Sequence, residues 1–259
     1  MSKKKKRKKG NSPVMDGLFY GTQIIFGVTI VGCILLFFMS GYWKTSVQLY
    51  KDAKTMVENS TREDFEAYKT SVVYDDKGNI IKLIKKDRFQ VCLGFDEIPQ
   101  TAKDAIVSIE DKRFYEHHGV DLKAITRAMV ALVQKDAITQ GGSTITQQLS
   151  RNIFLTHTVS WERKVEEIFI SLRLEKIYSK EDILEFYFNN VYFANGYYGI
   201  EAASIGYFNK SCKELNLSEI AFLCSIPNSP SMYDPRKHID STLKRRNLIL
   251  EEMLEDGKI

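Results

Sequence analysis

The chain has 259 residues, which is enough for one domain of comfortable size and a short additional segment. Its formal net charge is +4, but the seven residues from Lys3 to Lys9 are all positive, so the remainder carries 30 basic against 33 acidic residues. A nucleic-acid-binding protein is therefore not expected, although the pI of about 8.7 would otherwise suggest one. The four cysteines have no metal-ligand spacing, and a disulfide framework is not expected.

Two segments come before the folded part of the chain. Residues 1–16 form a lysine-rich tail that cannot bury apolar surface and is expected to be disordered. Residues 17–43 carry no charge over 27 positions, which is long enough for a single transmembrane helix, and Tyr42 and Trp43 suit the membrane interface. The apolar run exceeds that of a cleaved signal peptide, so we expect an uncleaved anchor. The positive tail then stays in the cytoplasm, and the chain after Lys44 lies outside.

The next stretch predicts a stalk and a small β region. Residues 44–70 are polar and charged, which indicates a helical stalk or linker. A domain over residues 71–259 then begins with two β-rich runs around a turn that contains Asp and Gly, which predicts a hairpin over residues 71–84. Residues 89–93 can add a strand that stops at Ile98 and Pro99.

Helices dominate the rest of the chain. An apolar run from Ala102 to Ile109 predicts the first of them. A second, with one buried stripe, follows from apolar residues at i, i+3, i+7 and i+10, namely Leu122, Ile125, Met129 and Leu132. Ser179 and Asp182 predict a capping box at the start of another helix. Further helices are expected from Leu217 and from about Ser241, so the fold class is mainly α.

Three blocks of residues carry the candidate chemistry. Residues 110–119 follow an apolar helical run and begin with two adjacent carboxylates. Residues 141–148 combine Gly-Gly with hydroxyl and amide side chains, and residues 163–167 place two cations before a carboxylate. Each block alone also fits a plain structural role: a charged helix end, a solvated helix face or a surface ion pair.

Together and in this order, the blocks resemble the peptidoglycan glycosyltransferases, the transglycosylase module of class A penicillin-binding proteins and its monofunctional relatives. The family pattern Glu-Asp-x-x-Phe-x-x-His-x-Gly is met by Glu110, Asp111, Phe114, His117 and Gly119. Gly-Gly-Ser-Thr-Ile-Thr-Gln-Gln is met without a mismatch by residues 141–148, and Arg-Lys-x-x-Glu is met by Arg163, Lys164 and Glu167. Two further blocks lie at residues 183–189 and 245–247, so the resemblance runs from about Ser71 to the end of the chain.

The resemblance implies a lysozyme-like glycosyltransferase domain anchored in the bacterial plasma membrane with its catalytic part outside. Such an enzyme polymerises lipid II into β-1,4-linked glycan strands, with inversion at the anomeric carbon and release of undecaprenyl diphosphate. The expected partners are lipid II, the growing glycan strand, the membrane and other cell-wall synthesis proteins. A divalent metal, magnesium or manganese, is a possible cofactor.

Glu110 is the expected general base for this reaction. A carboxylate that ends an apolar helix is half buried, and burial makes a carboxylate a better proton acceptor. Phe114 is expected to line the site beside it. Asp111 points elsewhere on a helix and is assigned a supporting hydrogen bond. Adjacent histidines on a helix also diverge, so His117 is expected to fix the cleft rather than to bind a metal with His118.

The second block is expected to bind the sugar and phosphate groups of the substrate. Gly142 and its neighbour free the backbone to approach a ligand, and Ser143 is expected to cap the helix that follows. A helix N-terminus attracts phosphate. The side chains of Thr146, Gln147 and Gln148 are expected to offer donors to sugars.

The third block is expected to hold the leaving diphosphate through Arg151, Arg163 and Lys164. Lys164 and Glu167 share one helix face, and the opposite, buried face is assigned to Val165, Phe169 and Leu172. Because a carboxylate repels a diphosphate, the second catalytic residue, Glu167, either orients Lys164 and Arg151 or helps to hold a divalent metal. These two alternatives stay open.

One apolar patch and two rival functions complete the expectations. Ile153, Phe154 and Leu155, with Trp161, form either core or a membrane contact. A lysozyme-like cleft with two carboxylates also suits a hydrolase of the same glycan. A hydrolase, however, has no diphosphate for Arg151, Arg163 and Lys164 to neutralise. A non-catalytic scaffold for cell-wall proteins has no need of Glu110 or Glu167.

Overall fold

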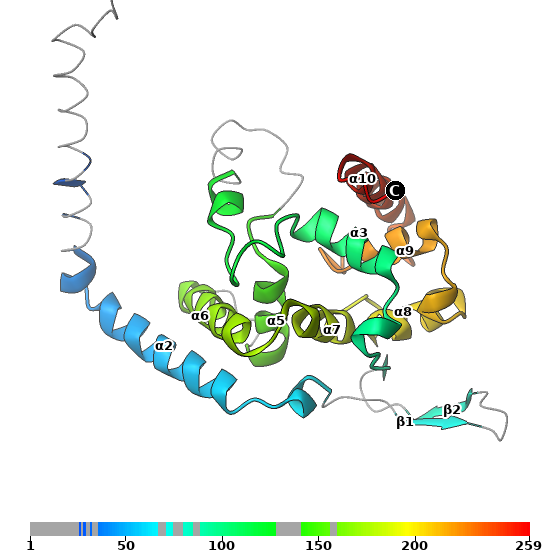
Figure 1. Cartoon of the computed structure of the whole chain (residues 1–259), viewed down its shortest axis with the longest axis horizontal. Coiled ribbons are helices and arrows are strands. Elements are labelled where there is room, and N and C mark those ends of the chain that lie inside the picture. Colours follow the sequence, from blue (N-terminus) through cyan, green and yellow to red (C-terminus); the bar gives the residue numbers. More distant parts are fainter. Residues whose placement is uncertain are drawn as a thin grey trace, which may run out of the picture. The chain divides into compact units, whose positions relative to one another are not determined.

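The structure is a computed structural model, and it describes residues 26, 28–29, 32, 36–66, 71–74, 80–84, 89–127, 141–155 and 160–259. Helices dominate this part of the chain (Figure 1). The α-helices are α2 Tyr42–Glu58, α3 Gln100–Glu110, α5 Ile145–Phe154, α6 Trp161–Ile177, α7 Lys180–Asn190, α8 Ile200–Phe208, α9 Leu217–Cys224 and α10 Ile239–Glu255. The 3-10 helices are η1 Arg62–Glu66, η2 Phe95–Glu97 and η3 Cys212–Glu214. The predicted mainly α class is confirmed.

The chain divides into two units, residues 1–48 and 49–259. The predicted basic tail and most of the predicted transmembrane segment, residues 17–43, lie outside the described residues, so both stay predictions. Among the helices that the structure describes, none combines the length and apolar character needed to cross a bilayer. The candidate site lies in the second unit.

Helix α7 lies at the centre of the second unit. It packs between α5 and α8, while α3, α9 and α10 pack against one another (Figure 1). The capping box predicted for its start is confirmed, because Ser179 accepts from the Asp182 amide and the Asp182 carboxylate accepts from the Ser179 amide. Apolar and polar residues alike are buried from Ile183 to Asn190, as expected for a helix covered on all sides.

The segment expected to be a stalk is helical, but it also contributes to the core. Ala53 and Val57 of α2 and Phe65 of η1 are buried in the same apolar cluster as α7. The ring of Phe65 stacks on Phe186 with a centroid distance of 4.0 Å and meets Phe154 edge-on at 5.9 Å. These contacts tie residues 49–66 to the second unit.

The β structure is small. Strands β1 Ser71–Tyr74 and β2 Ile80–Ile84 pair antiparallel, which confirms the predicted hairpin. Strand β3 Phe89–Gln90 is shorter than predicted and does not join this hairpin. It pairs in parallel with β4 Tyr197–Tyr198, since the Phe89 amide donates to the Gly196 carbonyl at 3.2 Å.

The predicted buried position of Leu122 and the predicted buried face of α6 are wrong. Leu122, expected in the core, is 73% exposed, and Ile125 is half-buried; the rest of that stripe lies outside the described residues. In α6 the buried residues are Glu167, Ile170, Ser171 and Leu174, whereas the predicted Val165, Phe169 and Leu172 are half-buried or exposed. Small polar contacts explain the second result, because the Ser171 and Ser150 hydroxyls meet at 2.8 Å where α6 packs on α5.

Candidate active site

Glu110 is the last residue of α3 and lies almost wholly buried, at 7% exposure. Its carboxylate receives hydrogen bonds from three N–H donors on three other segments. The Gln148 amide donates to Oε2 at 2.9 Å, and the Arg245 guanidinium donates to Oε1 at 2.8 Å. The Asn228 amide lies 3.2 Å from Oε1 and 3.4 Å from Oε2. An ionised carboxylate only accepts hydrogen bonds, so this set of donors fits an anionic Glu110.

Arg245 and Asn228 are site residues that the sequence reasoning missed. Arg245 lies on the buried face of α10, 8% exposed, and its guanidinium also lies over the Tyr233 ring at 5.3 Å from the centroid. The family block at residues 245–247 was the one signal that pointed to it. Asn228 follows Pro227 in the turn after α9, where the sequence predicts only the end of a helix. Both residues hydrogen-bond Glu110 although they lie far from it in the sequence.

Asp111 points away from Glu110, as predicted. Its carboxylate accepts from His117 Nε2 at 2.9 Å and from the Ile145 amide at 3.0 Å. Because the Gly119 amide donates to His117 Nδ1 at 3.2 Å, the ring proton lies on Nε2 and is donated to Asp111. The buried His117 and the exposed His118 diverge, also as predicted. These bonds join the end of α3 to the start of α5.

Gly119 is required by geometry. Its φ is +95°, and a Cβ there would lie 2.7 Å from the Ser171 backbone of α6. Its carbonyl accepts from the Thr144 hydroxyl at 2.7 Å. The loop after α3 therefore packs closely against α6 and the start of α5.

Thr144, not Ser143, caps α5. The Thr144 hydroxyl accepts from the Gln147 amide, and the Gln147 side chain accepts from the Thr144 amide, which is a complete capping box. The prediction for Ser143 is therefore wrong. Since Asp111 occupies the Ile145 amide, this helix N-terminus is engaged by the protein's own groups rather than presented to a phosphate.

The three polar residues of α5 also turn inward. Thr146 donates to Glu175 Oε1 at 2.6 Å, and Gln147 serves the cap. Gln148 binds Glu110 and accepts at 3.3 Å from the Tyr187 hydroxyl. All three are buried, so their described contacts place them in the support of the site. Their predicted contacts with sugars stay a prediction.

A second buried carboxylate, Glu167 of α6, holds the cations. The Lys164 amine donates to its Oε1, and Arg151 Nη1 lies 4.0 Å from its Oε2. Lys164 also donates to the Ser143 hydroxyl at 2.9 Å. The predicted shared face of Lys164 and Glu167 is confirmed, and the contacts match the alternative in which Glu167 orients these two cations. Arg163 is the third residue of the same helix, and its amide donates to the Ser160 hydroxyl that caps the helix.

The described residues around Glu167 do not form a metal ligand set. Within the described ranges, no group of three or more His, Cys, Asp or Glu side chains is arranged to hold a metal ion. Glu167 has its nearest charged contacts with cations instead.

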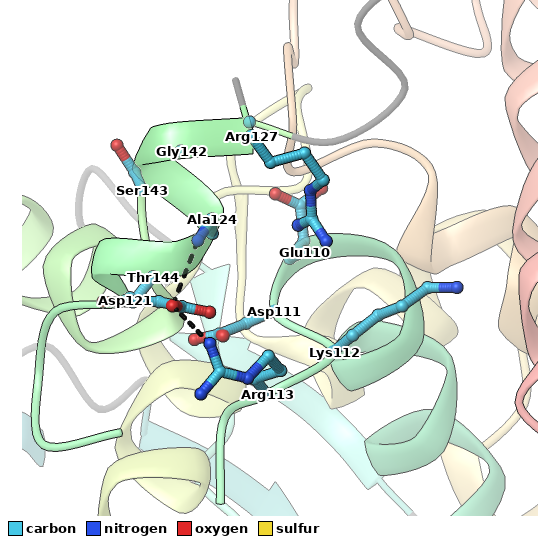
Figure 2. A pocket seen from close by; sticks show the side chains of 11 residues that line it. Glu110, Asp111, Lys112, Arg113, Asp121, Ala124, Arg127, Gly142, Ser143 and Thr144 are labelled. Atoms are coloured by element: carbon cyan, nitrogen blue, oxygen red, sulfur yellow. Dashed lines mark hydrogen bonds and ion pairs between the residues drawn. The ribbon is translucent and has the colours of Figure 1, made fainter. Parts of the chain in front are cut away.

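A pocket brings the two blocks of the site together. Figure 2 shows Glu110 and Arg127 directed into one space, with Ser143 on the rim. Asp121 accepts from Arg113 at 2.8 Å and from the Ala124 amide at 3.1 Å, as the dashed lines indicate. The described lining consists of Glu110, Asp111, Lys112, Arg113, Asp121, Ala124, Arg127, Gly141, Gly142, Ser143 and Thr144. Because Ser143 binds Lys164, the cations of α6 adjoin this pocket.

One apolar prediction is wrong, and one apolar patch with two open alternatives is now described. Phe114 is wholly buried in the core, where its ring lies under the Lys180 amine at 4.3 Å, so it packs the site from behind and does not line it. Burial lowers the pKa of Lys180 despite its ion pair with Glu175. For the apolar patch, where core and membrane contact were both open, Ile153, Phe154 and Leu155 pack against the core, whereas Trp161 is 43% exposed.

The mainly helical fold and the two buried carboxylates, each in contact with a cation, are features of an enzyme's active site. Comparison with known proteins gives the family. The transglycosylase family model matches residues 77–254, which is more than half of the chain, and the chain therefore belongs to the transglycosylase family. The peptidoglycan glycosyltransferases identified from the sequence are confirmed as its family, and with them its assignment as an enzyme.

Penicillin-binding proteins are among its relatives. The chain is 38% identical over 239 residues to Penicillin-binding protein 4 of Bacillus subtilis (strain 168), covering 91% of this chain and 38% of that protein. It is 45% identical over 191 residues to Penicillin-binding protein 1F of the same organism, covering 73% of this chain and 26% of that protein. A crystal structure of Penicillin-Binding Protein 1A from Haemophilus influenzae aligns with a TM-score of 0.39 and 20% identity, covering 74% of this chain and 19% of that chain. The chain thus spans 26% to 38% of the length of the two curated relatives.

Proposed function

We propose that the domain polymerises lipid II into β-1,4-linked glycan strands by inverting glycosyl transfer and releases undecaprenyl diphosphate. One observation carries this proposal. The buried Glu110 carboxylate, held by three N–H donors, lies in a pocket whose rim residue Ser143 is bound to Lys164. A proton acceptor and a cationic group therefore serve one space, as transfer from a sugar diphosphate requires.

Glu110 acts as the general base. A carboxylate has about four acceptor positions on its two oxygens. The Asn228 amide is shared between both oxygens at 3.2 and 3.4 Å, and the incoming 4-hydroxyl takes the place of its longer contact, on Oε2. Glu110 takes the hydroxyl proton as the oxygen attacks the anomeric carbon from the face opposite the diphosphate, which inverts that carbon. The bond to the diphosphate breaks as the new glycosidic bond forms.

The cations stabilise the leaving group. A diphosphate departs without a proton, so the site needs positive charge rather than a general acid. Lys164 and Arg151 are held by Glu167, and Arg163 lies in the first turn of the same helix as Lys164. Binding of magnesium or manganese at Glu167 stays a prediction from the sequence, and the reaction as proposed contains no metal step.

The proposal includes a membrane location. Residues 17–43 serve as a single transmembrane anchor with the basic tail in the cytoplasm, and the lysozyme-like catalytic domain lies outside. The growing glycan strand is the second substrate, and other cell-wall synthesis proteins are partners. The uncharged run over 27 residues supports the anchor.

The decisive experiment incubates the purified full chain with labelled lipid II in bilayer discs and resolves the products by size. Long glycan strands with released undecaprenyl diphosphate are expected. A hydrolase would instead shorten preformed glycan and leave lipid II unchanged. A scaffold would change neither substrate while still binding other wall-synthesis proteins. Either of these two results would reject the proposal.

A further inference from the structure

A buried group of ionisable side chains directly follows Glu110 and takes no part in the proton transfer. Its members come from the loop after α3, from α6 and from the start of α7, and they are Asp111, His117, Glu175 and Lys180. Asp111 and His117 are each 6% exposed, and the side chain of Glu175 is 3% exposed. Charge is costly to bury unless it is paired, so the partners of each member indicate what the group does.

Glu175 is the centre of this group. Its Oε1 accepts from the Thr146 hydroxyl at 2.6 Å and lies 3.8 Å from His117 Nδ1. Its Oε2 forms an ion pair of 2.6 Å with the amine of Lys180, the first residue of α7. That amine also lies 4.3 Å from the centroid of the Phe114 ring, whose face attracts a cation. Glu175 therefore joins α5 and α7 to the loop that carries His117.

His117 lies between two carboxylates but is neutral. Its Nε2 donates to Asp111, and its Nδ1 accepts from the Gly119 amide, so the ring carries one proton. Two carboxylates and one amine leave a net negative charge around this ring. Without Lys180 that charge would favour a second proton on Nδ1, which faces Glu175.

The second proton would remove a contact of the loop after α3. A protonated Nδ1 is a donor, so it cannot accept from the Gly119 amide. Gly119 has little room to adjust, because a Cβ there would lie 2.7 Å from the Ser171 backbone. Its carbonyl also accepts from Thr144, the residue that caps α5. The loop and the start of α5 therefore keep all of these contacts only while His117 is neutral.

Other charged groups near His117 do not supply this balance. Those that line the same open hollow as its ring are Arg113, His118, Asp121 and Lys123. Arg113 is paired with Asp121 at 2.8 Å and with Glu116 at 2.7 Å. His118 and Lys123 are exposed, so solvent screens their charge. The charge that favours a second proton thus comes from Asp111 and Glu175, and Lys180 opposes it.

We infer that Lys180 is a positioning residue of the active site, because its pairing with Glu175 keeps His117 neutral. The inference rests on the proposed function, since it concerns the frame that holds the general base of the same reaction. Lys180 is not among the described residues that line the Glu110 pocket, so it acts through its partners and touches no substrate.

The effect reaches Glu110 by two routes. A neutral His117 fixes Asp111, which directly follows Glu110 in the chain. Thr146, which donates to the carboxylate of the ion pair, lies two residues before Gln148 on α5. The Gln148 amide in turn donates to Glu110. Both routes set the position of the Glu110 carboxylate.

The test follows the His117 ring by nitrogen NMR while the pH is lowered. The full chain is held in detergent micelles, and glutamine replaces the other three of its four histidines. In Lys180→Met the pKa of His117 should rise by about one unit or more, because a cation has been removed from its surroundings. Adding Glu175→Gln should lower the pKa again, and Lys180→Arg should leave it unchanged.

The rate of lipid II polymerisation should follow the ring. In Lys180→Met its fall toward acid pH should begin about one unit higher than in the parent, and most of the rate should return at alkaline pH. Adding Glu175→Gln should restore the parent's profile. Lys213→Met is the matched control, because Lys213 forms a 3.1 Å ion pair with Glu97 at the surface. It should alter neither the titration of the ring nor the pH profile of the rate.

An unchanged His117 titration in Lys180→Met would overturn the inference, as would an equal loss of rate at every pH. Either result would make the ion pair a support of the fold alone. If Lys180→Met does not fold, Glu175→Gln alone decides, because it should lower the pKa of His117, and an unchanged or higher value would contradict the inference. The ring titration needs no substrate, so it is separate from lipid II polymerisation by the parent chain, which reports on the proposed function.

Discussion

The two buried carboxylates of the site, Glu110 and Glu167, are held in opposite ways. Glu110 is enclosed by donors from three segments, and its cation, Arg245, is itself buried. Glu167 is wholly buried, but the side chain of its partner Lys164 is 43% exposed and that of Arg151 is 33% exposed. Oε2 of Glu167 has no hydrogen-bond partner among the described residues, although Arg151 lies 4.0 Å from it.

Glu110 is therefore held in a fixed environment, whereas Glu167 holds cations that a ligand can still reach. The donors around Glu110 are in place before substrate arrives, so the base needs little rearrangement during reaction. The cations on Glu167 keep one side toward solvent, where an anionic ligand can reach them. We therefore expect changes at Glu110 to affect the rate or the stability, and changes at Lys164 to affect ligand binding.

The largest expected effect follows Glu110→Gln. The change keeps the shape of the side chain but removes the proton acceptor and replaces one accepting oxygen with a donating NH2 group. General-base contributions are about 10² to 10⁴ in rate. Polymerisation of lipid II should fall by at least the lower figure, while circular dichroism shows a folded chain. Glu116→Gln is the control, because this exposed carboxylate of the following loop contacts only Arg113 in the described structure. Activity within a few-fold of the parent in Glu110→Gln would reject the base assignment.

The next effect concerns the stability of the Glu110 side. Arg245→Met leaves a buried carboxylate without its cation, and breaking such a pair costs about 3–5 kcal/mol of unfolding free energy. Chemical denaturation should show that loss, and adding Glu110→Gln should recover part of it without restoring activity. Arg246→Met should stay within about 0.5 kcal/mol, because Arg246 hydrogen-bonds the exposed Asn247. Equal losses of unfolding free energy in the two arginine variants would mean that Arg245 stabilises the fold by packing and not by its charge.

On the Glu167 side the expected effect is smaller and appears in binding. Lys164→Ala removes a charge-assisted contact worth about 1.5–3 kcal/mol, so affinity for a lipid diphosphate should fall about 10- to 100-fold. Arg151 remains near Glu167, and the chain should stay folded. Lys164→Arg should be partly tolerated, since either cation binds a diphosphate. Lys176→Ala, on the exposed end of α6, is the control, and unchanged affinity in Lys164→Ala would move the phosphate site elsewhere.

The sequence predicted what depends on neighbouring residues. Helix α3, the hairpin and the Ser179–Asp182 capping box all follow from short patterns of polarity and hydrogen bonding, and the structure confirms them. Ordered motifs identified the family and the residues of three blocks. The divergence of Asp111 from Glu110 was also expected, although Asp111 is the C-cap that follows α3, with a non-helical φ of −158°.

The sequence could not predict contacts between distant segments. Asn228 and Arg245 reach Glu110 from 118 and 135 residues away, and no local pattern records such a meeting. The buried face of α6 was misassigned for the same reason. Glu167 and Ser171 are polar, and their burial depends on α5 partners, Arg151 and Ser150, that only the tertiary fold supplies.

The smallest predicted effect concerns Asp182, a partly exposed carboxylate that can be compared with the two buried ones. Burial raises the pKa of Asp182, but hydrogen bonds from Arg62 and Ser179 outweigh it and lower the pKa overall from its ordinary value of 3.8. The unfolded chain therefore binds the proton more readily, so the contribution to stability is present above pH 3.8 and is lost as pH falls through the folded value. Asp182→Asn should cost about 0.2–1 kcal/mol at about neutral pH, and nothing once the parent carboxylate is protonated. Denaturation at both pH values measures this, with the exposed Asp96→Asn as the control. A loss that persists undiminished in acid would assign the role of Asp182 to helix capping rather than to its charge.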